Sequence, residues 1–423
     1  MQICIFEDLH YDRLEPFTYA RPAYNLYCGF TRLRDKIIRA YPEAKVILQC
    51  RSYLKSFLEI KNTRYSINEI EAGDCLFING RILAPRNLGD IIPIADTTNK
   101  LYKNGDTIIA ARVSGDLLER IKSNLNDVLT PTDFDGLPVE QVDVDYFEYM
   151  WDFIHKNPKA MQDDYDHFFS SGGFSASDRV RGKVYHGALF VEPDNIVIEE
   201  GAVVRPGAVL DASSGPIFLD KHSIVYPNAV LEGPVYIGEG THVKSGARIY
   251  DSVSIGKVCK VGGEIEQTVM LPYSNKQHSG FMGHSYIGSW VNIGADTNCS
   301  DLKNNYGNVK IHVGGEYVDS GHQFLGLIMA DHSKVAINSM FNTGTVVGFF
   351  CNIFGADFPP KFIPSFSWGG SGSITTYDLE RSIETAKRVM ARRNKVMHET
   401  EERLLRKVFD LTQKERRKRG YPY

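Results

Sequence analysis

The most regular pattern in the chain is an aliphatic residue at every sixth position of its second half. This spacing runs without a break from Leu219 to Val261, and it is also present before and after that run. A period of six fits neither the 3.6-residue turn of an α-helix nor the alternation of a surface strand. It is typical of a three-sided prism of short strands, in which one side chain of each hexapeptide points into a narrow core. The positions are Ile198, Val204, Leu210, Leu219, Val225, Leu231, Ile237, Val243, Ile249, Ile255, Val261, Phe281, Ile287, Ile293, Met329, Val335, Phe341, Val347 and Ile353.

We therefore predict a left-handed parallel β-helix over residues 181–370. Each coil of such a solenoid buries its apolar position only by stacking on its neighbours. Two stretches, Glu264 to Gly280 and Asn298 to Gln323, interrupt the count of six and hold much of the unusual polar chemistry. Insertions in solenoids form loops on one face, which is often the binding face. Both stretches are therefore predicted to leave the wall of the prism as loops.

The chain before the prism shows a different pattern, in which short apolar runs alternate with a helical one. Strands alternating with helices predict an α/β domain, here over residues 1–180. Ser170 to Gly173 marks the junction with the prism. The predicted strands are Gln2–Phe6, Lys45–Gln49, Cys75–Ile78 and Thr107–Val113, and the predicted helix is Thr31–Ala40.

After Gly372 the pattern becomes helical. Five apolar residues fall seven apart and form one narrow stripe, which predicts a long C-terminal α-helix within residues 371–423. The helix is expected to pack on the prism or on a neighbouring subunit. The stripe consists of Ile383, Met390, Met397, Leu404 and Leu411.

Composition narrows the class of protein. The formal net charge of −4 provides no general basic field for nucleic acid. Seven scattered cysteines without a CxxC pair favour a reducing compartment over a disulfide framework or a zinc site. No run approaches 18 apolar residues, so a membrane-spanning segment is not expected. We expect a cytoplasmic protein that has neither nucleic acid nor a membrane as its partner.

A motif around the first interruption resembles a known family. Lys276 and His278 are followed by Val291-Asn292-Ile293-Gly294-Ala295 and then by Asn305-Tyr306. Arg205-Pro206-Gly207 lies upstream. These segments resemble the acetyltransferase domain of the bifunctional bacterial enzymes that combine glucosamine-1-phosphate N-acetyltransferase and N-acetylglucosamine-1-phosphate uridyltransferase activities. The resemblance covers roughly residues 195 to 355.

The resemblance implies an acetyl-CoA-dependent N-acetyltransferase that acts on an aminosugar phosphate. An imidazole suits this reaction because its pKa lies near neutrality, where it can accept the proton of an amine. The resemblance assigns His278 as this general base. It also implies a homotrimer with active sites between neighbouring prisms. The implied substrate-binding residues are Arg205, Lys276, Asn292, Asn305 and Tyr306, with Lys244 or Arg248 as alternatives to Arg205 for the sugar phosphate.

The first domain resembles the nucleotidyltransferase half of the same enzymes. Arg13-Leu14-Glu15-Pro16-Phe17-Thr18 is similar to the Arg-Leu-x-Pro-Leu-Thr of sugar-nucleotide pyrophosphorylases. Glu7 to Asp12 contains no glycine where the family has a phosphate-binding loop, and Arg81 stands where it has a metal-binding Asp. The resemblance implies a nucleoside triphosphate as substrate and Mg²⁺ as its cofactor if this domain is active, with an unknown set of metal ligands. The implied nucleotide-binding residues are Arg13, Arg21, Asn79 and Gly80.

Two hypotheses from different classes remain open at this point. The first is an enzyme of sugar-nucleotide biosynthesis, an N-acetyltransferase with a possible nucleotidyltransferase activity in its first domain. The second is a non-catalytic trimeric β-helix whose first domain senses sugar nucleotides. The gathering of polar residues near one interruption favours the enzyme, because a purely structural solenoid does not require them.

Overall fold

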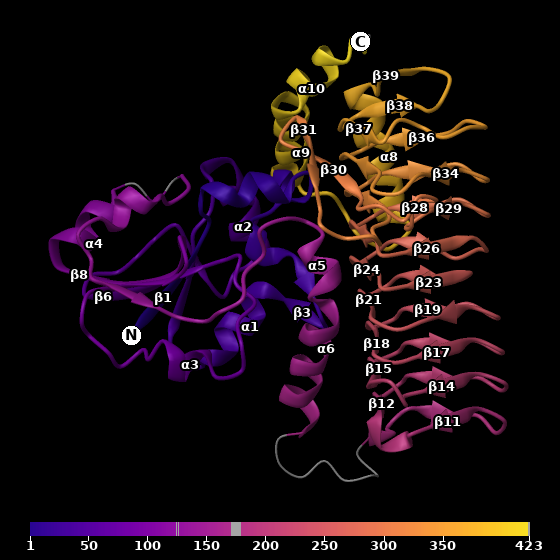
Figure 1. The fold of residues 1–423 in the computed structure, drawn as a ribbon, viewed down its shortest axis with the longest axis horizontal. Coiled ribbons are helices and arrows are strands. Elements are labelled where there is room, and N and C mark those ends of the chain that lie inside the picture. Colours follow the sequence, from indigo (N-terminus) through magenta and orange to yellow (C-terminus); the bar gives the residue numbers. More distant parts are fainter. Residues whose placement is uncertain (124, 126, 171–178, 422–423) are drawn as a thin grey trace. The chain divides into compact units, whose positions relative to one another are not determined.

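The chain divides into two compact units. The structure, a computed structural model, describes residues 1–123, 125, 127–170 and 179–421 (Figure 1). The first unit contains residues 1–26, 31–149 and 398–408, and the second contains 27–30, 150–397 and 409–423. Residues 150–170 thus lie with the second unit, ahead of the boundary predicted at residue 180. The predicted junction from Ser170 to Gly173 lies, except for Ser170, outside the described residues.

The first unit is built on one mixed sheet, as the predicted α/β class requires. Its strand order is β5-β4-β1-β6-β8-β7-β9, with β1 parallel to β4 and β6, and with β8 antiparallel to β6 and β7. The strands are β1 (Gln2–Phe6), β4 (Lys45–Leu48), β5 (Ser66–Ile67), β6 (Asp74–Asn79), β7 (Lys100–Asn104), β8 (Thr107–Ser114) and β9 (Val139–Gln141). The α-helices in its part before residue 150 are α1 (Leu33–Ala40), α2 (Lys55–Lys61), α3 (Leu88–Ile91) and α4 (Gly115–Lys122).

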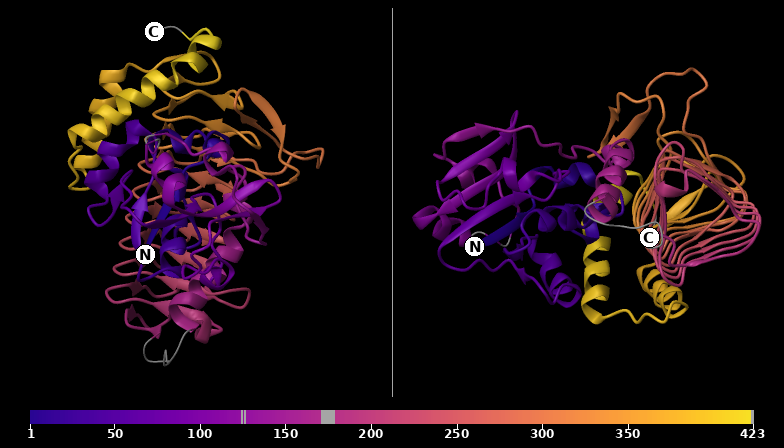
Figure 2. Two further views of the ribbon diagram at one scale, coloured as in Figure 1. Left: turned by 90° about the vertical axis from the view of Figure 1, so that its left-hand side faces the viewer. Right: turned by 90° about the horizontal axis from the view of Figure 1, so that it is seen from below.

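The second unit contains the predicted left-handed parallel β-helix, whose coils are seen end-on in the right-hand view of Figure 2. The chain visits three sheets in turn, which we call face 1, face 2 and face 3. Face 1 contains β10 (Lys183–Val184), β13 (Val203–Val204), β16 (Ile224–Val225), β19 (His242–Val243), β22 (Lys260–Val261), β25 (Asn275–Lys276), β28 (Asn292–Ile293), β33 (Lys334–Val335), β36 (Asn352–Ile353), β38 (Ser367–Gly369) and β39 (Ile374–Thr376). Face 2 contains β11 (Leu189–Val191), β14 (Val209–Asp211), β17 (Val230–Glu232), β20 (Arg248–Ile249), β23 (Glu264–Glu266), β26 (Phe281–Gly283), β29 (Asn298–Cys299) and β34 (Met340–Phe341). Face 3 contains β12 (Ile196–Ile198), β15 (Ile217–Leu219), β18 (Val235–Ile237), β21 (Val253–Ile255), β24 (Val269–Met270), β27 (Tyr286–Ile287), β32 (Ile328–Met329), β35 (Val346–Val347) and β37 (Phe362–Ile363).

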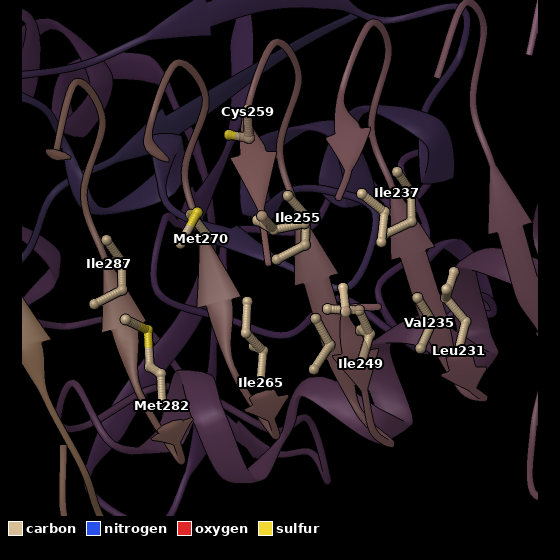
Figure 3. Close-up of a cluster of buried hydrophobic side chains, with 14 of the residues drawn as sticks. Leu231, Val235, Ile237, Ile249, Ile255, Cys259, Ile265, Met270, Met282 and Ile287 are labelled. Atoms are coloured by element: carbon tan, nitrogen blue, oxygen red, sulfur yellow. The ribbon is translucent and has the colours of Figure 1, made fainter. Parts of the chain in front are cut away.

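The core of the prism is the predicted set of aliphatic residues. Every position with the spacing of six lies in this buried cluster except Phe281. Figure 3 shows part of the cluster. Phe281 is half-buried, and the next residue, Met282, occupies the inward position instead. Side chains from successive coils meet along the axis, so that each coil is stabilised by its two neighbours.

The first predicted interruption is wrong, because Glu264 to Gly280 remains in the wall. Strands β23, β24 and β25 pair in parallel with the coils on both sides. The count of six fails there because the inward residues after Val261 are Ile265, Met270 and Lys276, which lie four, five and six positions apart in succession. Short corners shift the sequence period, although the coil itself continues.

The second predicted interruption is a true insertion, with different bounds. The chain leaves the wall after β29 on face 2 and returns at β32 on face 3. Between them lies an antiparallel hairpin of β30 (Lys310–Val313) and β31 (Glu316–Asp319). Asn298 and Cys299, which were predicted to lie in the loop, are still part of the wall.

An aromatic column follows the corner between face 3 and face 1. The third residue of this corner has a positive φ in successive coils, a backbone conformation that costs energy for any residue except glycine. In five consecutive coils it carries a ring, and adjacent ring centroids lie 4.3, 6.1, 4.5 and 5.2 Å apart. Stacking between the rings offsets part of the backbone cost. The rings belong to Tyr273, Trp290, His332, Phe350 and Phe366.

Two short helices before the prism pack on face 3. They are α5 (Asp152–His155) and α6 (Asn157–Tyr165). The buried amide of Asn157 donates to the carbonyl oxygen of Ser252 at 2.9 Å and accepts from the backbone N–H of Gly29 at 2.7 Å. The ring of Phe153 lies 5.5 Å from that of Tyr286. These contacts explain why residues 150–170 form part of the second unit.

The C-terminal segment is three helices, which corrects the prediction of one long helix. They are α8 (Leu379–Ala391), α9 (Glu399–Leu411) and α10 (Gln413–Lys418). Asn394 ends the first helical stretch with a φ of 53°, and the N–H of Lys395 donates to the carbonyl of Met390, a common way to terminate a helix. The predicted stripe is therefore broken at Met397, and Leu411 is 43% exposed.

Candidate functional site

The predicted base His278 lies in an open hollow of about 760 Å³ on the prism. The hollow follows the corner between face 1 and face 2, and the imidazole of His278 is exposed in it. It is formed entirely by the second unit. The lining residues are Lys244, Ser245, Gly246, Arg248, Gly262, Gly263, Glu264, Gln277, His278, Ser279, Gly280, Phe281, Ala295, Asp296 and Asn298.

The hollow arises from a mismatch in corner length. Most coils turn from face 1 to face 2 through four residues, as at 244–247 and 294–297. The coil beneath His278 turns through only Gly262 and Gly263, whereas the coil that carries His278 uses four residues, 277–280. The longer corner overhangs the shorter one. His278 thus lies on a projection above a recess.

Lys276 supports this projection from the inside. Its side chain is 1% exposed and takes the inward position that Val261 occupies in the preceding coil. Nζ donates hydrogen bonds to the carbonyl oxygens of His278, Ser279 and Gly262, at 3.0, 3.3 and 3.2 Å. Burial lowers the pKa of Lys276 to about 8. The prediction that Lys276 contacts the sugar phosphate is not supported, because its ammonium group is held by the backbone within the prism.

Two other cations line the hollow instead. Lys244 lies with its Nζ 4.9 Å from the centre of the Tyr226 ring and has no carboxylate partner among the described residues. Arg248 forms an ion pair with Glu264 at 2.6 Å, so part of its charge is already balanced. Lys244 is therefore the better placed of the two to attract a phosphate.

Arg205 does not reach this hollow. It precedes Gln277 by four coils along the same corner, through the successive pairs of β13, β16, β19, β22 and β25. At the usual spacing of parallel strands this separation is about 19 Å. The guanidinium of Arg205 lies 5.0 Å from the Tyr185 ring centre instead. Within one chain, Arg205 and His278 therefore do not share a site.

The other predicted sugar-binding residues lie elsewhere on the second unit. Asn292 is exposed on face 1 and lines a different hollow, beside α8. Asn305 and Tyr306 belong to the insertion, where Tyr306 is 65% exposed. The Asn305 side chain accepts a hydrogen bond from the N–H of Gly307 at 3.1 Å. Within a single chain none of the three lines the hollow of His278.

A histidine cluster that the sequence did not reveal lies at the corner between face 2 and face 3. His284 Nδ1 is 2.8 Å from Asp301 Oδ2, an arrangement that orients an imidazole. The ring of His155, from α5, stacks on that of His322 with centroids 3.7 Å apart and lies 6.3 Å from that of His284. Burial, followed by the charges of the other two imidazoles, lowers the pKa of His155 to about 4. The only signal in the sequence was the insertion, which contributes both Asp301 and His322.

In the first unit, the residue that replaces the family's metal-binding Asp neutralises a carboxylate. Arg81 is 1% exposed and forms two hydrogen bonds to Asp8, one of them from Nε at 2.7 Å. Asn79 donates to the same carboxylate at 2.9 Å. Burial acts to raise the pKa of Asp8, but the hydrogen bonds and charge of Arg81 outweigh it and hold the pKa below its ordinary value.

A second buried ion pair, Glu7–Arg51, occupies the position after β1 where the family has its glycine-rich loop. Both side chains are at most 5% exposed, and Arg51 Nε lies 3.1 Å from Glu7 Oε2. Arg51 also donates to the carbonyl of Thr18 at 2.6 Å and lies over the ring of Tyr11 at 3.9 Å. The segment that would bind phosphates is thus fixed by this arginine.

The predicted nucleotide-binding residues lie around these pairs. Arg13 forms an ion pair with Glu148, and Arg21 accepts a hydrogen bond from Arg51 through its backbone oxygen at 3.1 Å. Asn79 is fully buried. At Gly80 a Cβ would lie 2.8 Å from the Tyr24 side chain, so the glycine is required for packing.

These residues do not fit Mg²⁺. The ion is usually bound through one or two carboxylates together with waters and substrate phosphates, yet the oxygens of Asp8 face Arg81 and those of Glu7 face Arg51. In the described part of the chain, no group of three or more His, Cys, Asp or Glu side chains is arranged to hold a metal ion. No helix among the described residues has the length and apolar character that spanning a membrane requires.

Comparison with known proteins agrees with both halves of the predicted resemblance. Residues 3–171 match the family model described as "Sugar nucleotidyl transferase". The bifunctional sugar-1-phosphate nucleotidylyltransferase/acetyltransferase of Sulfurisphaera tokodaii is 27% identical over 175 residues, which cover 36% of this chain and 43% of that one. The bifunctional protein GlmU of Geotalea daltonii is 31% identical over 158 residues (36% and 31%), and that of Bartonella quintana is 21% identical over 266 residues (60% and 48%).

The chain spans less than half the length of each of these curated relatives. Among solved structures, the Arabidopsis UDP-N-acetylglucosamine acyltransferase overlaps with a TM-score of 0.27 at 15% identity, covering 51% of this chain and 78% of that one. That overlap is too loose to carry an argument. The chain is thus similar in part to bifunctional sugar-1-phosphate nucleotidylyltransferase/acetyltransferases, and its residues 3–171 are similar to the sugar nucleotidyl transferase family.

Proposed function

We propose that the protein is a transferase of sugar-nucleotide biosynthesis that acetylates the amino group of an aminosugar phosphate with acetyl-CoA. The observation that carries the proposal is the exposed imidazole of His278 on a projecting corner, above a recess lined by Lys244. An enzyme of this class requires both a base and a phosphate-binding charge. The sequence relationship to bifunctional enzymes with an acetyltransferase half supports the same class.

In this mechanism His278 accepts the proton of the amine as the nitrogen attacks the thioester carbonyl. The N–C bond forms, the C–S bond breaks, and coenzyme A leaves as the thiol after protonation of its sulfur. Lys276 takes no direct part. It is a positioning residue, because its three hydrogen bonds fix the backbone on which His278 stands. Lys244 attracts the phosphate of the sugar.

We further propose a homotrimer in which a neighbouring prism completes the site. The hollow is open on its outer side, and Asn305 and Tyr306 lie exposed on an insertion that could reach a neighbouring chain. Asn292, Arg205 and the insertion residues would then act across the interface. Sedimentation at micromolar concentration should give a trimer, and a monomer would contradict this part of the proposal.

For the first unit we propose binding of a sugar nucleotide without nucleotidyl transfer. The two buried arginine–carboxylate pairs occupy the positions at which the family holds phosphates and metal, which favours the sensing alternative for this domain. Release of pyrophosphate from a nucleoside triphosphate and a sugar 1-phosphate would refute it. We place the whole protein in the cytoplasm, because all seven cysteines are buried free thiols that suit a reducing compartment.

Release of coenzyme A in the presence of glucosamine 1-phosphate tests the acetyl transfer. His278→Ala should reduce turnover about 10²- to 10⁴-fold, the usual contribution of a general base. His186→Ala is the matched control, because His186 is the exposed second residue of the equivalent corner in the first coil, outside the hollow. Full activity of His278→Ala would show that another group is the base. His284→Ala would then test the His284–Asp301 pair.

A further inference from the structure

A second hollow, of about 310 Å³, lies between α8 and face 1 of the prism. It is separate from the hollow of His278 but adjoins it, since Gln277 lines both. Of its lining, the proposed acetyl transfer uses only Asn292, across the trimer interface. Its lining consists of Lys260, Tyr273, Asn275, Gln277, Trp290, Val291, Asn292, Lys334, Thr385, Val389, Arg392 and Arg393.

The lining is strongly basic. It contains two lysines and two arginines and no carboxylate, and none of the four forms an ion pair with any residue that the structure describes. Burial lowers the pKa of Lys334 to about 7, so the full charge of the hollow comes mainly from the other three. Burial lowers the pKa of Lys260, and the nearby cations Arg393, Lys244 and Arg392 lower it further. Like charges held together without a counter-charge repel one another. An anion bound among them would relieve this repulsion.

The cations are held in fixed positions rather than spread over a mobile surface. Lys334 donates to the carbonyl oxygens of Trp290 and His332 at 2.7 and 2.8 Å. Arg393 donates through Nη2 to the side chain of Asn275 at 2.9 Å, which ties the end of α8 to face 1. The Tyr273 and Trp290 rings stack nearly parallel, with an interplanar angle of 6°. The hollow is therefore pre-organised, which lowers the cost of binding.

We propose that this hollow binds the diphosphate of a nucleotide-type ligand. Guanidinium groups match phosphate oxygens in geometry, and Lys260, Arg392 and Arg393 together carry more positive charge than a single phosphate requires. The volume lies at the lower end of the range for small-molecule sites, so the hollow accommodates part of such a ligand. Two ligands carry this chemistry, coenzyme A and a sugar nucleotide. The site is assigned from its charges and does not depend on acetyl transfer.

Calorimetric titration of the full-length protein with coenzyme A and, separately, with UDP-N-acetylglucosamine tests the assignment. Lys260→Gln and Arg393→Gln should each weaken binding of one of the two ligands about ten- to a hundredfold, as expected for a lost charge-assisted hydrogen bond. The ligand whose binding is weakened identifies the source of the diphosphate. Arg388→Gln is the matched control, because Arg388 lies on α8 five residues before Arg393, pairs with Glu384 and does not line the hollow.

His278→Ala should leave this binding unchanged, which separates failure of the site from failure of the acetyl-transfer proposal. If the affinities of Lys260→Gln and Arg393→Gln for both ligands equal those of the unaltered protein, the assignment is wrong. The same conclusion follows if Arg388→Gln weakens binding as strongly as they do. Circular dichroism of each variant shows whether a loss of binding reflects a loss of fold.

Discussion

Substituting Gly280 tests whether the four-residue corner is as tightly packed as its geometry indicates. Gly280 ends the corner that carries His278, with a φ of 109°. A Cβ at this position would lie 2.1 Å from the carbonyl oxygen of Thr297 in the next coil. Gly246 is the third residue of the corresponding corner two coils below, 244–247, with a φ of 68°, and a Cβ there would meet nothing within 4 Å. The two glycines therefore share a strained backbone but differ in the space around them.

The expected magnitudes follow from this comparison. Alanine at a positive φ costs about 1–2 kcal/mol, and this cost applies at both positions. Gly280→Ala must in addition displace a backbone carbonyl, for which overpacking typically costs about 1–3 kcal/mol more. The backbone of Thr297 cannot move alone, because Asn298 and Cys299 pair with β34 directly after it. We therefore expect a loss of about 2–5 kcal/mol for Gly280→Ala and about 1–2 kcal/mol for Gly246→Ala.

Urea unfolding followed by circular dichroism measures both values, with the slope of the transition checked for each variant. Hydrogen exchange localises the effect, and we expect faster exchange at residues 277–283 in Gly280→Ala only. Equal destabilisation by the two substitutions would refute the reasoning, because it would mean that the contact with Thr297 has no energetic consequence.

Three further outcomes follow from buried charges. Lys276→Met should raise hydrogen exchange at residues 277–280 by tenfold or more, measured by mass spectrometry, because three carbonyl oxygens lose their donor; unchanged exchange would contradict the supporting role. Arg81→Ala should destabilise the first unit by about 3–5 kcal/mol in urea unfolding, since it leaves the Asp8 carboxylate buried without a counter-charge. Asp8→Asn should cost less, and the reverse order would show that the pair is not the cause. His155 remains neutral in the folded state down to about pH 4, whereas an unfolded histidine takes up its proton near pH 6.5. Stability should therefore fall between pH 6.5 and pH 4, with a share of about 1–2 kcal/mol from this partly exposed ring; His155→Phe should flatten that slope in thermal melts, and an unaltered slope would contradict the assignment.

The prism was predictable because one inward aliphatic residue per strand leaves a direct trace in the sequence. The corners leave a weaker signal in the sequence than the strands do. Gly262-Gly263 turns the chain with two residues fewer than the neighbouring corners, so the count of six stops although the wall continues. A sequence period cannot distinguish a shortened corner from a loop. The same shift concealed that Lys276 occupies a core position, which only the pairing of β22 with β25 reveals.

Residues of the candidate site that belong to a sequence motif could be predicted. Which residues come together in one site could not be predicted, because that depends on their separation in the folded prism. His278 was predicted as the base from its neighbours in sequence, and its role stays a prediction. The distance between Arg205 and His278 depends on how many coils separate them, and resemblance to a motif does not preserve that number. His155 meets His284 and His322 only because α5 packs against the prism. The first domain showed Arg81 in place of a carboxylate, but its pairing with Asp8 required the folded sheet.

The aromatic column makes the prism mechanically uneven. Coils from Tyr273 to Phe366 are joined by stacked rings at one corner, whereas Gly201, His222, Gly240 and Val258 hold the equivalent position in the coils before them. In a solenoid, each coil can open separately from those that are not its neighbours. The coils before Tyr273 should therefore open locally more easily than the coils from Tyr273 onward. The coil of His278 is the first that contributes a ring to the column. The corner that bears the imidazole therefore lies at the boundary between the coils without stacked rings and the coils with them.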